Sequence, residues 1–277
     1  MALQGKITTS LHTDPGQVRK NNEDAIDEDD KIGLLILADG MGGYKAGEIA
    51  SGMCVATVKD IMGGQWPLLD GEQRDDKSGM CKATLMLRDA LSTAHQAIHE
   101  VSASQPQCEG MGTTAVAVLF FNNRASIAHV GDSRLYRLRA NQLEQLTTDH
   151  SLVEEMVARG LYSREDALKN VNSNIVTRAL GIEPTVDIDM LEEPLQRDDV
   201  LLLCSDGLTD LVDDELIRLT LTQNVANLPQ AGERLIQLAN ERGGKDNISV
   251  ILARIDGTFV HKPSWFDSLR KRLQGEP

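Results

Sequence analysis

Four aspartates stand beside strongly apolar stretches of this sequence. Asp39, Asp132 and Asp206 each follow such a stretch closely, and Asp246 lies just before another. A carboxylate at a strand end is often a turn former that hydrogen-bonds its own backbone. Four of them at strand edges could instead gather into one cluster, which is stable only when partners or metal ions neutralise its charge. Oxygen ligands without a supporting set of His or Cys favour Mg²⁺ or Mn²⁺ over zinc.

A second group of charged residues lies near the N-terminus, in the segment RKNNED. It contains Arg19, Glu23 and Asp24. The planar guanidinium of an arginine binds a phosphate through two parallel hydrogen bonds. Glycines follow both Asp39 and Asp206, and a glycine lets the backbone turn sharply and present a carbonyl oxygen as a further ligand. These residue types therefore suit a site for divalent cations and a phosphate.

Several other catalytic chemistries do not fit the sequence. A cysteine phosphatase needs an Arg six positions after its nucleophilic Cys, and none of the four cysteines has one. The glycines at 40–43 are not followed by the Lys-Ser/Thr of a P-loop, and Lys45 stands where a dinucleotide fingerprint has its third glycine. No GxSxG nucleophile elbow is present. His95 and His99 are spaced as in a zinc protease but lack the Glu of HExxH.

The chain as a whole has the composition of a globular protein. Its 277 residues are 41% hydrophobic and 25% charged, which suits one large domain or two smaller ones. The formal net charge of −14 argues against nucleic acid or an anionic membrane as the main partner. That charge either serves solubility or forms, in part, a cluster that binds cations.

The same sequence bears on the compartment. No apolar run approaches the roughly 18 residues of a membrane span, and the first residues lack the apolar stretch of a secretory signal. The four cysteines show no CxxC spacing, which indicates reduced thiols. We therefore expect a cytoplasmic protein with no transmembrane segment.

Helical and strand-like patterns come in separate batches along the chain. Apolar periodicity predicts helices near 48–62, 87–101 and 230–242. Three successive apolar runs separated by short polar turns indicate an antiparallel meander. The strands expected are 33–38, 113–121, 125–130, 134–139, 199–204 and 248–255. Such batches favour an α+β layered sandwich over a doubly wound sheet.

In three segments the sequence pattern predicts the structure or its role less clearly. Residues 63–81 are polar and aperiodic, which predicts a loop, and residues 150–180 look helical with a weak apolar pattern. In the tail 257–277, Trp265, Leu269 and their neighbours can share one face of a short amphipathic helix. That helix would pack on its own domain or dock to a partner or membrane surface.

Six short motifs occur in a fixed order over about residues 8–255. They are Arg19…Asn22-Glu-Asp-Ala25, Ala38-Asp-Gly-Met-Gly-Gly43, Gly112-Thr-Thr114, Val130-Gly-Asp-Ser-Arg134, Ser205-Asp-Gly-Leu208 and Lys245-Asp-Asn247. In order and spacing, they resemble the motifs of the PPM (PP2C-type) protein serine/threonine phosphatases in their bacterial form.

The resemblance implies a four-layer α-β-β-α sandwich with a central antiparallel β-sandwich and a small helical flap. It implies a catalytic domain over residues 1–256, with the flap at about 150–180, followed by the tail 257–277. It also implies a centre of two or three Mg²⁺ or Mn²⁺ ions at one end of the β-sandwich.

The resemblance further assigns roles in this centre. Asp39 would bridge two metals, Asp206 and Asp246 would complete the first, and the Gly40 carbonyl would help to hold the second. Asp132, together with Asp206, matches the third-metal site of bacterial members.

The residues near the N-terminus also match family positions. Glu23 and Asp24 align with acidic positions beside the second metal, either in direct contact or through water. Arg19 matches the phosphate-binding arginine. Met41 stands where eukaryotic members carry a histidine proposed to protonate the leaving group, and His150 is either a helper in that step or a structural residue.

The function implied is hydrolysis of phosphoserine and phosphothreonine in proteins by a metal-activated water. The expected partners are phosphorylated proteins, with a bacterial Ser/Thr kinase as the opposing enzyme, and the chain is expected to be a monomer that binds no nucleic acid. The alternatives are a two-metal phosphodiesterase acting on a small molecule and a catalytically inactive, phosphatase-like binding module. The second would have lost metal ligands, whereas every expected carboxylate is present.

Overall fold

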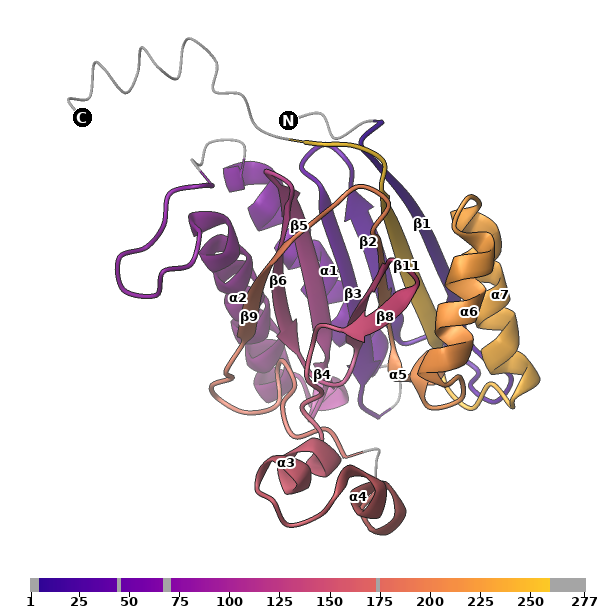
Figure 1. Cartoon of the computed structure of the whole chain (residues 1–277). Coiled ribbons are helices and arrows are strands. Elements are labelled where there is room, and N and C mark those ends of the chain that lie inside the picture. The colour runs from indigo at the N-terminus through magenta and orange to yellow at the C-terminus, as the bar shows by residue number, and fades with distance from the viewer. Residues whose placement is uncertain (1–4, 44–45, 67–70, 173–174, 260–277) are drawn as a thin grey trace, which may run out of the picture.

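The structure, a computed structural model, describes residues 5–43, 46–66, 71–172 and 175–259 (Figure 1). Its strands are β1 (Ile7–Asp14), β2 (Asp24–Asp29), β3 (Leu34–Met41), β4 (Gly112–Thr113), β5 (Ala115–Phe121), β6 (Arg124–Val130), β7 (Arg134–Arg139), β8 (Gln142–Gln145), β9 (Asp189–Pro194), β10 (Val200–Cys204) and β11 (Ile248–Ile255). Its helices are α1 (Ala46–Gln65), α2 (Lys82–Ser104), α3 (Leu152–Ala158), α4 (Arg164–Asn170), α5 (Asp206–Thr209), α6 (Asp214–Asn224) and α7 (Leu228–Glu241), with a 3₁₀ turn at Pro106–Cys108.

The strands form two antiparallel sheets. Sheet A has the order β1-β11-β10-β7-β8, and sheet B has the order β2-β3-β5-β6-β9 with β4 paired to β3. In Figure 1, α1 and α2 cover the outer face of sheet B, and α6 and α7 cover the outer face of sheet A. The result is the four-layer α-β-β-α sandwich expected from the family resemblance.

The alternation of side chains along β3 explains the layers. Leu34 and Ile36 point to one face and pack in a core with α1 and α2. Leu35 and Leu37 point to the other face and pack against Leu203 and other residues of sheet A. Successive residues of a strand face opposite sides, so a continuous apolar run is what a strand buried on both faces requires.

The predicted strands and helices are largely confirmed, with shifted ends. The strands predicted at 134–139 and 248–255 coincide with β7 and β11, and the three predicted helices correspond to α1, α2 and α7. The predicted loop 63–81 begins too early, because α1 continues to Gln65. The strand predicted at 33–38 ends too early, because β3 continues through Asp39 to Met41.

The sequence did not predict β1, β2, β8, β9, α5 or α6. Four of the six residues of β2 are acidic (DAIDED), a composition that is poor in strand formers. This strand forms because it pairs with β3 along its whole length, from Asp24 opposite Asp39 to Asp29 opposite Leu34. Tertiary pairing therefore overrides the local preference.

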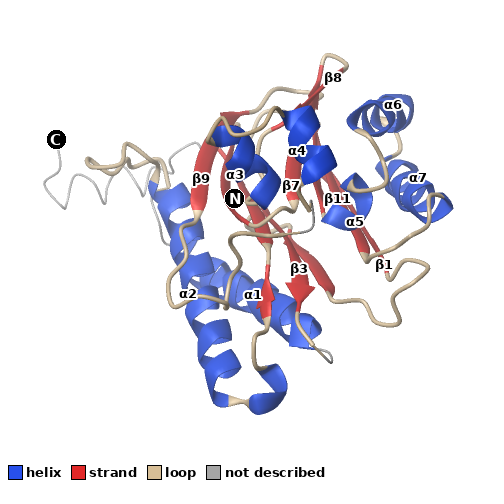
Figure 2. Ribbon diagram, turned by 90° about the horizontal axis from the view of Figure 1, so that it is seen from below, coloured by secondary structure: helices blue, strands red, loops and turns tan. Residues whose placement is uncertain are grey.

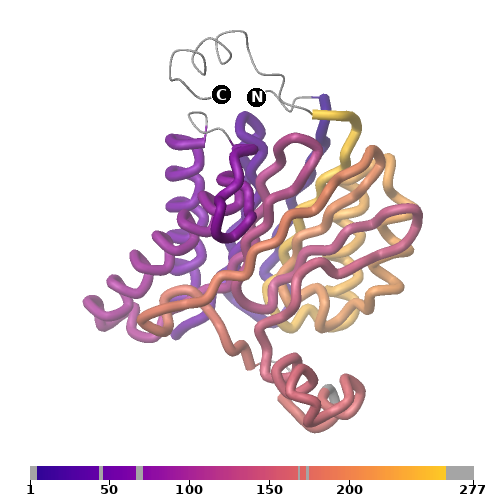
Figure 3. Tube along the Cα trace, turned by 60° about the vertical axis from the view of Figure 1, so that its left-hand side comes forward, coloured from indigo at the N-terminus to yellow at the C-terminus, as the bar shows by residue number. Residues whose placement is uncertain are grey.

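The segment predicted as helical at 150–180 contains two short helices, α3 and α4. Ser151 and Ser163 cap them, each accepting a hydrogen bond from a backbone N–H three residues on. At the base of the segment, Leu152 N donates to Ile175 O at 2.9 Å. Figure 3 shows this pair of helices standing clear of the sandwich.

The amphipathic helix predicted in the tail 257–277 falls almost entirely on residues 260–277, which lie outside the described residues. None of the described helices combines the length and the apolar character that a membrane crossing requires.

Candidate functional site

The acidic residues expected in the site come from both sheets and lie near the start of β2 and the end of β3. Figure 2 shows the sandwich from below. In sheet B, the register places Asp24, the first residue of β2, directly opposite Asp39 of β3. Ser205 Oγ donates to Asp24 Oδ2 at 2.9 Å. The other oxygen, Asp24 Oδ1, is buried without a hydrogen-bond partner among the described residues.

The backbone of Asp39 is held by two threonines of the Gly112-Thr-Thr114 motif. Asp39 N donates to Thr114 Oγ1 at 3.1 Å, and Asp39 O accepts from Thr113 Oγ1 and Thr114 N, both at 2.8 Å. Thr114 Oγ1 also bonds Ser133 Oγ at 2.7 Å. These contacts explain why the motif is needed: it fixes the strand end that carries the carboxylate.

Sheet A contributes Asp206 and Asp246. Asp206 opens α5 immediately after β10, and Asp246 lies just before β11. These two segments touch closely, because a Cβ on Gly207 would overlap the carbonyl oxygen of Asn247. Glycine is therefore required after Asp206 for close packing and not for a left-handed backbone.

The carboxylates lie close enough to raise one another's pKa values. Burial raises the pKa of Asp39 well above its usual range, and the charge of Asp24 raises it further. Burial likewise raises the pKa of Asp206, followed by the charge of Asp132. Burial raises the pKa of Asp24 to about 6. A group of carboxylates that resist ionisation together is a site that a cation would stabilise.

Asp132 lies in the turn after β6 and is buried, with an exposed fraction of 8%. Burial, followed by the charge of Asp149, raises its pKa to about 6. The preceding residue, Gly131, has a φ of +108°, and a Cβ there would overlap the side chain of Thr114. Gly131 N donates to His150 Nδ1 at 3.0 Å. His150 therefore supports the turn that carries Asp132.

The loop between β1 and β2 is organised by Asn247. Its Nδ2 donates to Pro15 O at 3.1 Å and to Asn21 O at 2.9 Å, and its Oδ1 accepts from Glu23 N at 2.8 Å. This loop carries Arg19, whose Nη2 donates to Asp246 Oδ2 at 2.6 Å. The Arg19 side chain is 52% exposed, so a guanidinium anchored in the acidic cluster lies at the protein surface.

Glu23, at the end of the same loop, lies beside Gly40. Gly40 N donates to Glu23 O at 3.1 Å, and a Cβ on Gly40 would overlap the carbonyl oxygen of Gly47 in α1. Burial raises the pKa of Glu23, Arg19 opposes the rise, and Asp246 adds to it. All eight residues expected in the site are thus in one region: Arg19, Glu23, Asp24, Asp39, Gly40, Asp132, Asp206 and Asp246.

The sequence motifs do not indicate Asp210 as part of the site, nor the partner of Arg134. The charge of Asp210 raises the pKa of Asp206, so it belongs to the same cluster. It lies four residues after Asp206, a helical spacing that could have identified it. Arg134 Nε and Nη2 donate to Asp149 at 2.7–3.0 Å. Nothing local in the sequence indicates that pair.

Comparison with known proteins gives a consistent result. A family model described as protein phosphatase 2C matches residues 9–248. A serine/threonine phosphatase of Listeria monocytogenes is 39% identical over 251 residues, covering 90% of this chain and 96% of that protein. The serine/threonine protein phosphatase PstP of Mycobacterium tuberculosis is 36% identical over 249 residues, covering 89% of this chain and 44% of PstP.

Solved structures are similar over nearly the whole chain. The crystal structure of Mycobacterium tuberculosis PstP matches with a TM-score of 0.79 and 34% identity, covering 91% of this chain and 100% of that one. The PstP catalytic domain in complex with two manganese ions matches with a TM-score of 0.76 and 34% identity, covering 91% and 99%.

Proposed function

The chain belongs to the protein phosphatase 2C family, and from that premise we propose that its acidic cluster binds two or three Mg²⁺ or Mn²⁺ ions for hydrolysis of phosphoserine and phosphothreonine in proteins. The chain is a serine/threonine protein phosphatase by this membership. The observation that carries the proposal is the meeting of Asp24, Asp39, Asp206 and Asp246 at one end of both sheets.

The residues present fit divalent cations. The donors are carboxylate oxygens, which suit Mg²⁺ and Mn²⁺. Asp24 Oδ1 is buried without a partner among the described residues, and a buried carboxylate oxygen in that state is costly unless something else binds it. We propose Asp39, Asp206, Asp246 and the Gly40 carbonyl as ligands, with Asp132 at a third position and Glu23 or Asp24 in contact directly or through water.

Bound cations would supply a lowered pKa for the attacking water and neutralisation of the phosphate charge. Arg19 would bind the phosphate through its guanidinium, because it lies at the surface of the cluster and is anchored on Asp246. It would also offset charge that develops on the phosphate oxygens in the transition state.

Two residues, Met41 and His150, bear on which group could protonate the leaving group. Met41 has no proton to give. His150 is buried, with Nδ1 accepting from Gly131 N and Nε2 lying 3.2 Å from Asp189 Oδ2. These contacts support a structural role for His150 and argue against a direct part in proton transfer.

We further propose the phosphoproteins of a Ser/Thr kinase as substrates, a monomer as the active form, and a cytoplasmic location. Residues 1–256 would form the catalytic domain, with the α3–α4 segment as a flap beside the site. The flap proposal is supported by His150, which lies at the start of that segment and contacts the Asp132 turn.

A substitution at the centre of the cluster tests the function. Asp39→Asn removes the charge with little change in shape and should abolish Mn²⁺-dependent release of phosphate from a phosphothreonine peptide. The exposed Asp76→Asn is the matched control and should keep wild-type turnover. Full activity of Asp39→Asn, or activity of the wild type in excess chelator, would contradict the proposal. An inactive wild type that still binds phosphopeptide would instead identify an inactive binding module.

A further inference from the structure

The backbone N–H and C=O of Gly131 are contacted by two buried histidines, His129 and His150. Gly131 O accepts from His150 N at 2.8 Å and lies 2.9 Å from His129 Nε2, and Gly131 N donates to His150 Nδ1 at 3.0 Å. The two imidazole rings are close, with centroids 4.6 Å apart. Because φ of Gly131 is positive, these hydrogen bonds stabilise a backbone conformation that directs the next residue, Asp132.

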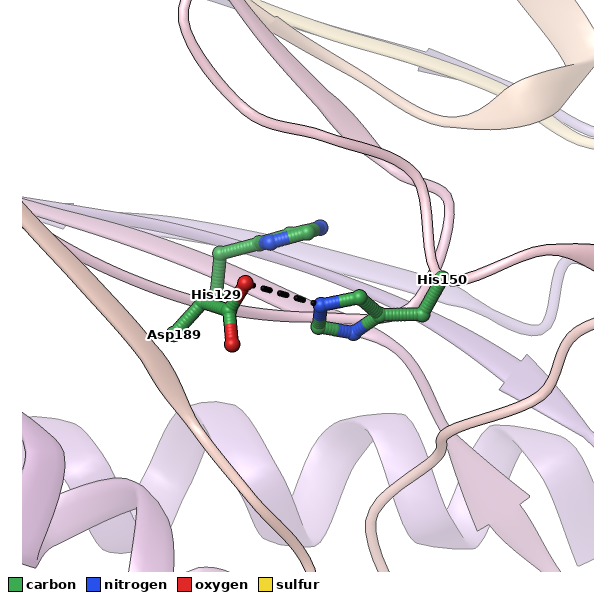
Figure 4. Close-up of side chains that lie close together, drawn as sticks. All are labelled: His129, His150 and Asp189. Carbon is green, nitrogen blue, oxygen red and sulfur yellow. Dashed lines mark ion pairs between the residues drawn. The ribbon is translucent and has the colours of Figure 1, made fainter. Parts of the chain in front are cut away.

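The contacts of His150 fix the position of its ring proton. Nδ1 accepts from the Gly131 N–H, so Nδ1 carries the lone pair and the single proton of the neutral ring is on Nε2. Nε2 faces Asp189 Oδ2 at 3.2 Å, and that carboxylate accepts the proton (Figure 4). His129 and Asp189 are directly opposite one another in the β6–β9 pair.

His129, His150 and Asp189 offer ligand atoms within 4.8 Å of one another, a spacing that a metal ion could use. The hydrogen bonds argue against that use. A metal would need a lone pair on His150 Nε2, whereas the one lone pair of the neutral ring already accepts from Gly131. Arg178 Nη1 also lies 3.4 Å from His150 Nε2 and 3.1 Å from Asp189 Oδ1, so a cationic group already occupies this position.

We propose that Asp189 and His150 are positioning residues: Asp189 holds the His150 proton on Nε2, so that Nδ1 fixes the Gly131 amide and thereby the turn that presents Asp132. The consequence for cation binding rests on the proposed function, whereas the proton position does not. Without Asp189, Arg178 is left to donate to Nε2, and the proton would move to Nδ1, where it faces the Gly131 N–H. Two donors would then oppose one another and the turn would lose its support.

The same histidine joins this turn to the base of the α3–α4 segment. Thr177 N donates to His150 O at 2.8 Å, and Ser151 bridges Val176. The base of that segment is therefore joined to the turn before Asp132 through His150, by its backbone N–H as well as its ring.

The proton position is tested in metal-free protein by the ¹⁵N chemical shifts of the imidazole nitrogens. The wild type should show His150 with its proton on Nε2. Asp189→Asn keeps an acceptor and should leave the spectrum unchanged, and Asp189→Ala should move the proton to Nδ1. A wild-type ring with its proton on Nδ1, or an unchanged Asp189→Ala spectrum, would overturn the proposal.

The effect on Asp132 is tested by Mn²⁺ titration calorimetry with two matched variants. His150→Asn places an oxygen near the position of Nδ1 and should keep an affinity close to that of the wild type. His150→Gln places its amide near Nε2, cannot accept from Gly131, and should weaken the weakest Mn²⁺ site about 10–100-fold, the usual cost of losing an outer-shell partner. Asp189→Ala should behave like His150→Gln, and the exposed Asp187→Ala like the wild type.

The outcomes separate the two proposals. Equal affinity losses in His150→Asn and His150→Gln, with melting temperatures that show both to be folded, would overturn the positioning role. Wild-type protein that binds no Mn²⁺ would contradict the proposed function, while the imidazole spectra would still decide the proton position.

Discussion

At the scale of single residues, Arg19 illustrates how the site combines opposite charges. The hydrogen bond with Asp246, burial of the side chain and the surrounding carboxylates act on its pKa, which is raised. Arginine is protonated in any case, so the raised pKa does not change its charge. It reflects the position of Arg19 beside the acidic cluster, at the protein surface. Its type and position in the motif were predictable from the sequence, whereas its partner Asp246, 227 positions away, was not.

Arg19→Ala should lower kcat/KM for a phosphothreonine peptide on the order of 10–100-fold, because one or two charge-assisted hydrogen bonds to the phosphate are lost. Mn²⁺ affinity should change little, since the carboxylates remain. Arg19→Lys should recover part of the loss. Arg88→Ala, which removes an arginine paired with Asp89 on α2, is the control and should have no effect. Unchanged kinetics in Arg19→Ala would show that Arg19 does not bind the phosphate.

At the scale of elements, the loop from β1 to β2 depends on a side chain from the other end of the sequence. Asn247 is 5% exposed and makes three hydrogen bonds to the backbone of this loop. The motif Lys245-Asp-Asn247 was recognised from the sequence, but the role of its last residue was not. A contact between positions 226 apart leaves no local pattern, whereas apolar runs such as 248–255 do.

Asn247→Ala should destabilise the protein by at least about 2 kcal/mol, because buried backbone groups lose their partners. It should also lower the specific activity of the folded protein, because Arg19 and Glu23 lose their support. Asn227→Ala removes the cap of α7, far along the chain from this loop, and should cost about 1 kcal/mol with unchanged kcat/KM. Urea unfolding and peptide kinetics measure both. A stable and fully active Asn247→Ala would show that the loop holds its own shape.

At the scale of the whole molecule, the site is shared by two sheets whose carboxylates repel one another. Because of this repulsion, the stability of the metal-free protein should depend on pH in a direction that can be measured. Burial raises the pKa of Asp132 to about 6, so the metal-free folded protein binds this proton more tightly than the unfolded chain does. The contribution of Asp132 to stability is therefore neutral below about pH 4 and becomes unfavourable as the pH rises to about 6.

Asp132→Asn should consequently stabilise the metal-free protein at pH 7, by up to about 3 kcal/mol, and should leave its stability unchanged at pH 4. The exposed Asp76→Asn should show no such difference between the two pH values. Urea unfolding in the presence of chelator measures this. Loss of stability in Asp132→Asn at pH 7 would mean that hydrogen bonds or charges of the protein itself stabilise the Asp132 carboxylate, so that it needs no cation.

The pairing of β1 with β11 has a consequence for the order in which the molecule can be made. Among the described residues, the eight residues of β1 (Ile7–Asp14) pair as a strand only with residues 248–255 of β11. During synthesis, the first strand must wait for nearly the whole chain before it can join a sheet, and contacts between such distant positions also slow folding. Asp246 and Asn247 emerge just before β11, so the proposed site can be completed only late in synthesis. If Asp246 acts in the site as proposed, a ribosome-bound chain that lacks it would not yet hydrolyse phosphoproteins in its surroundings.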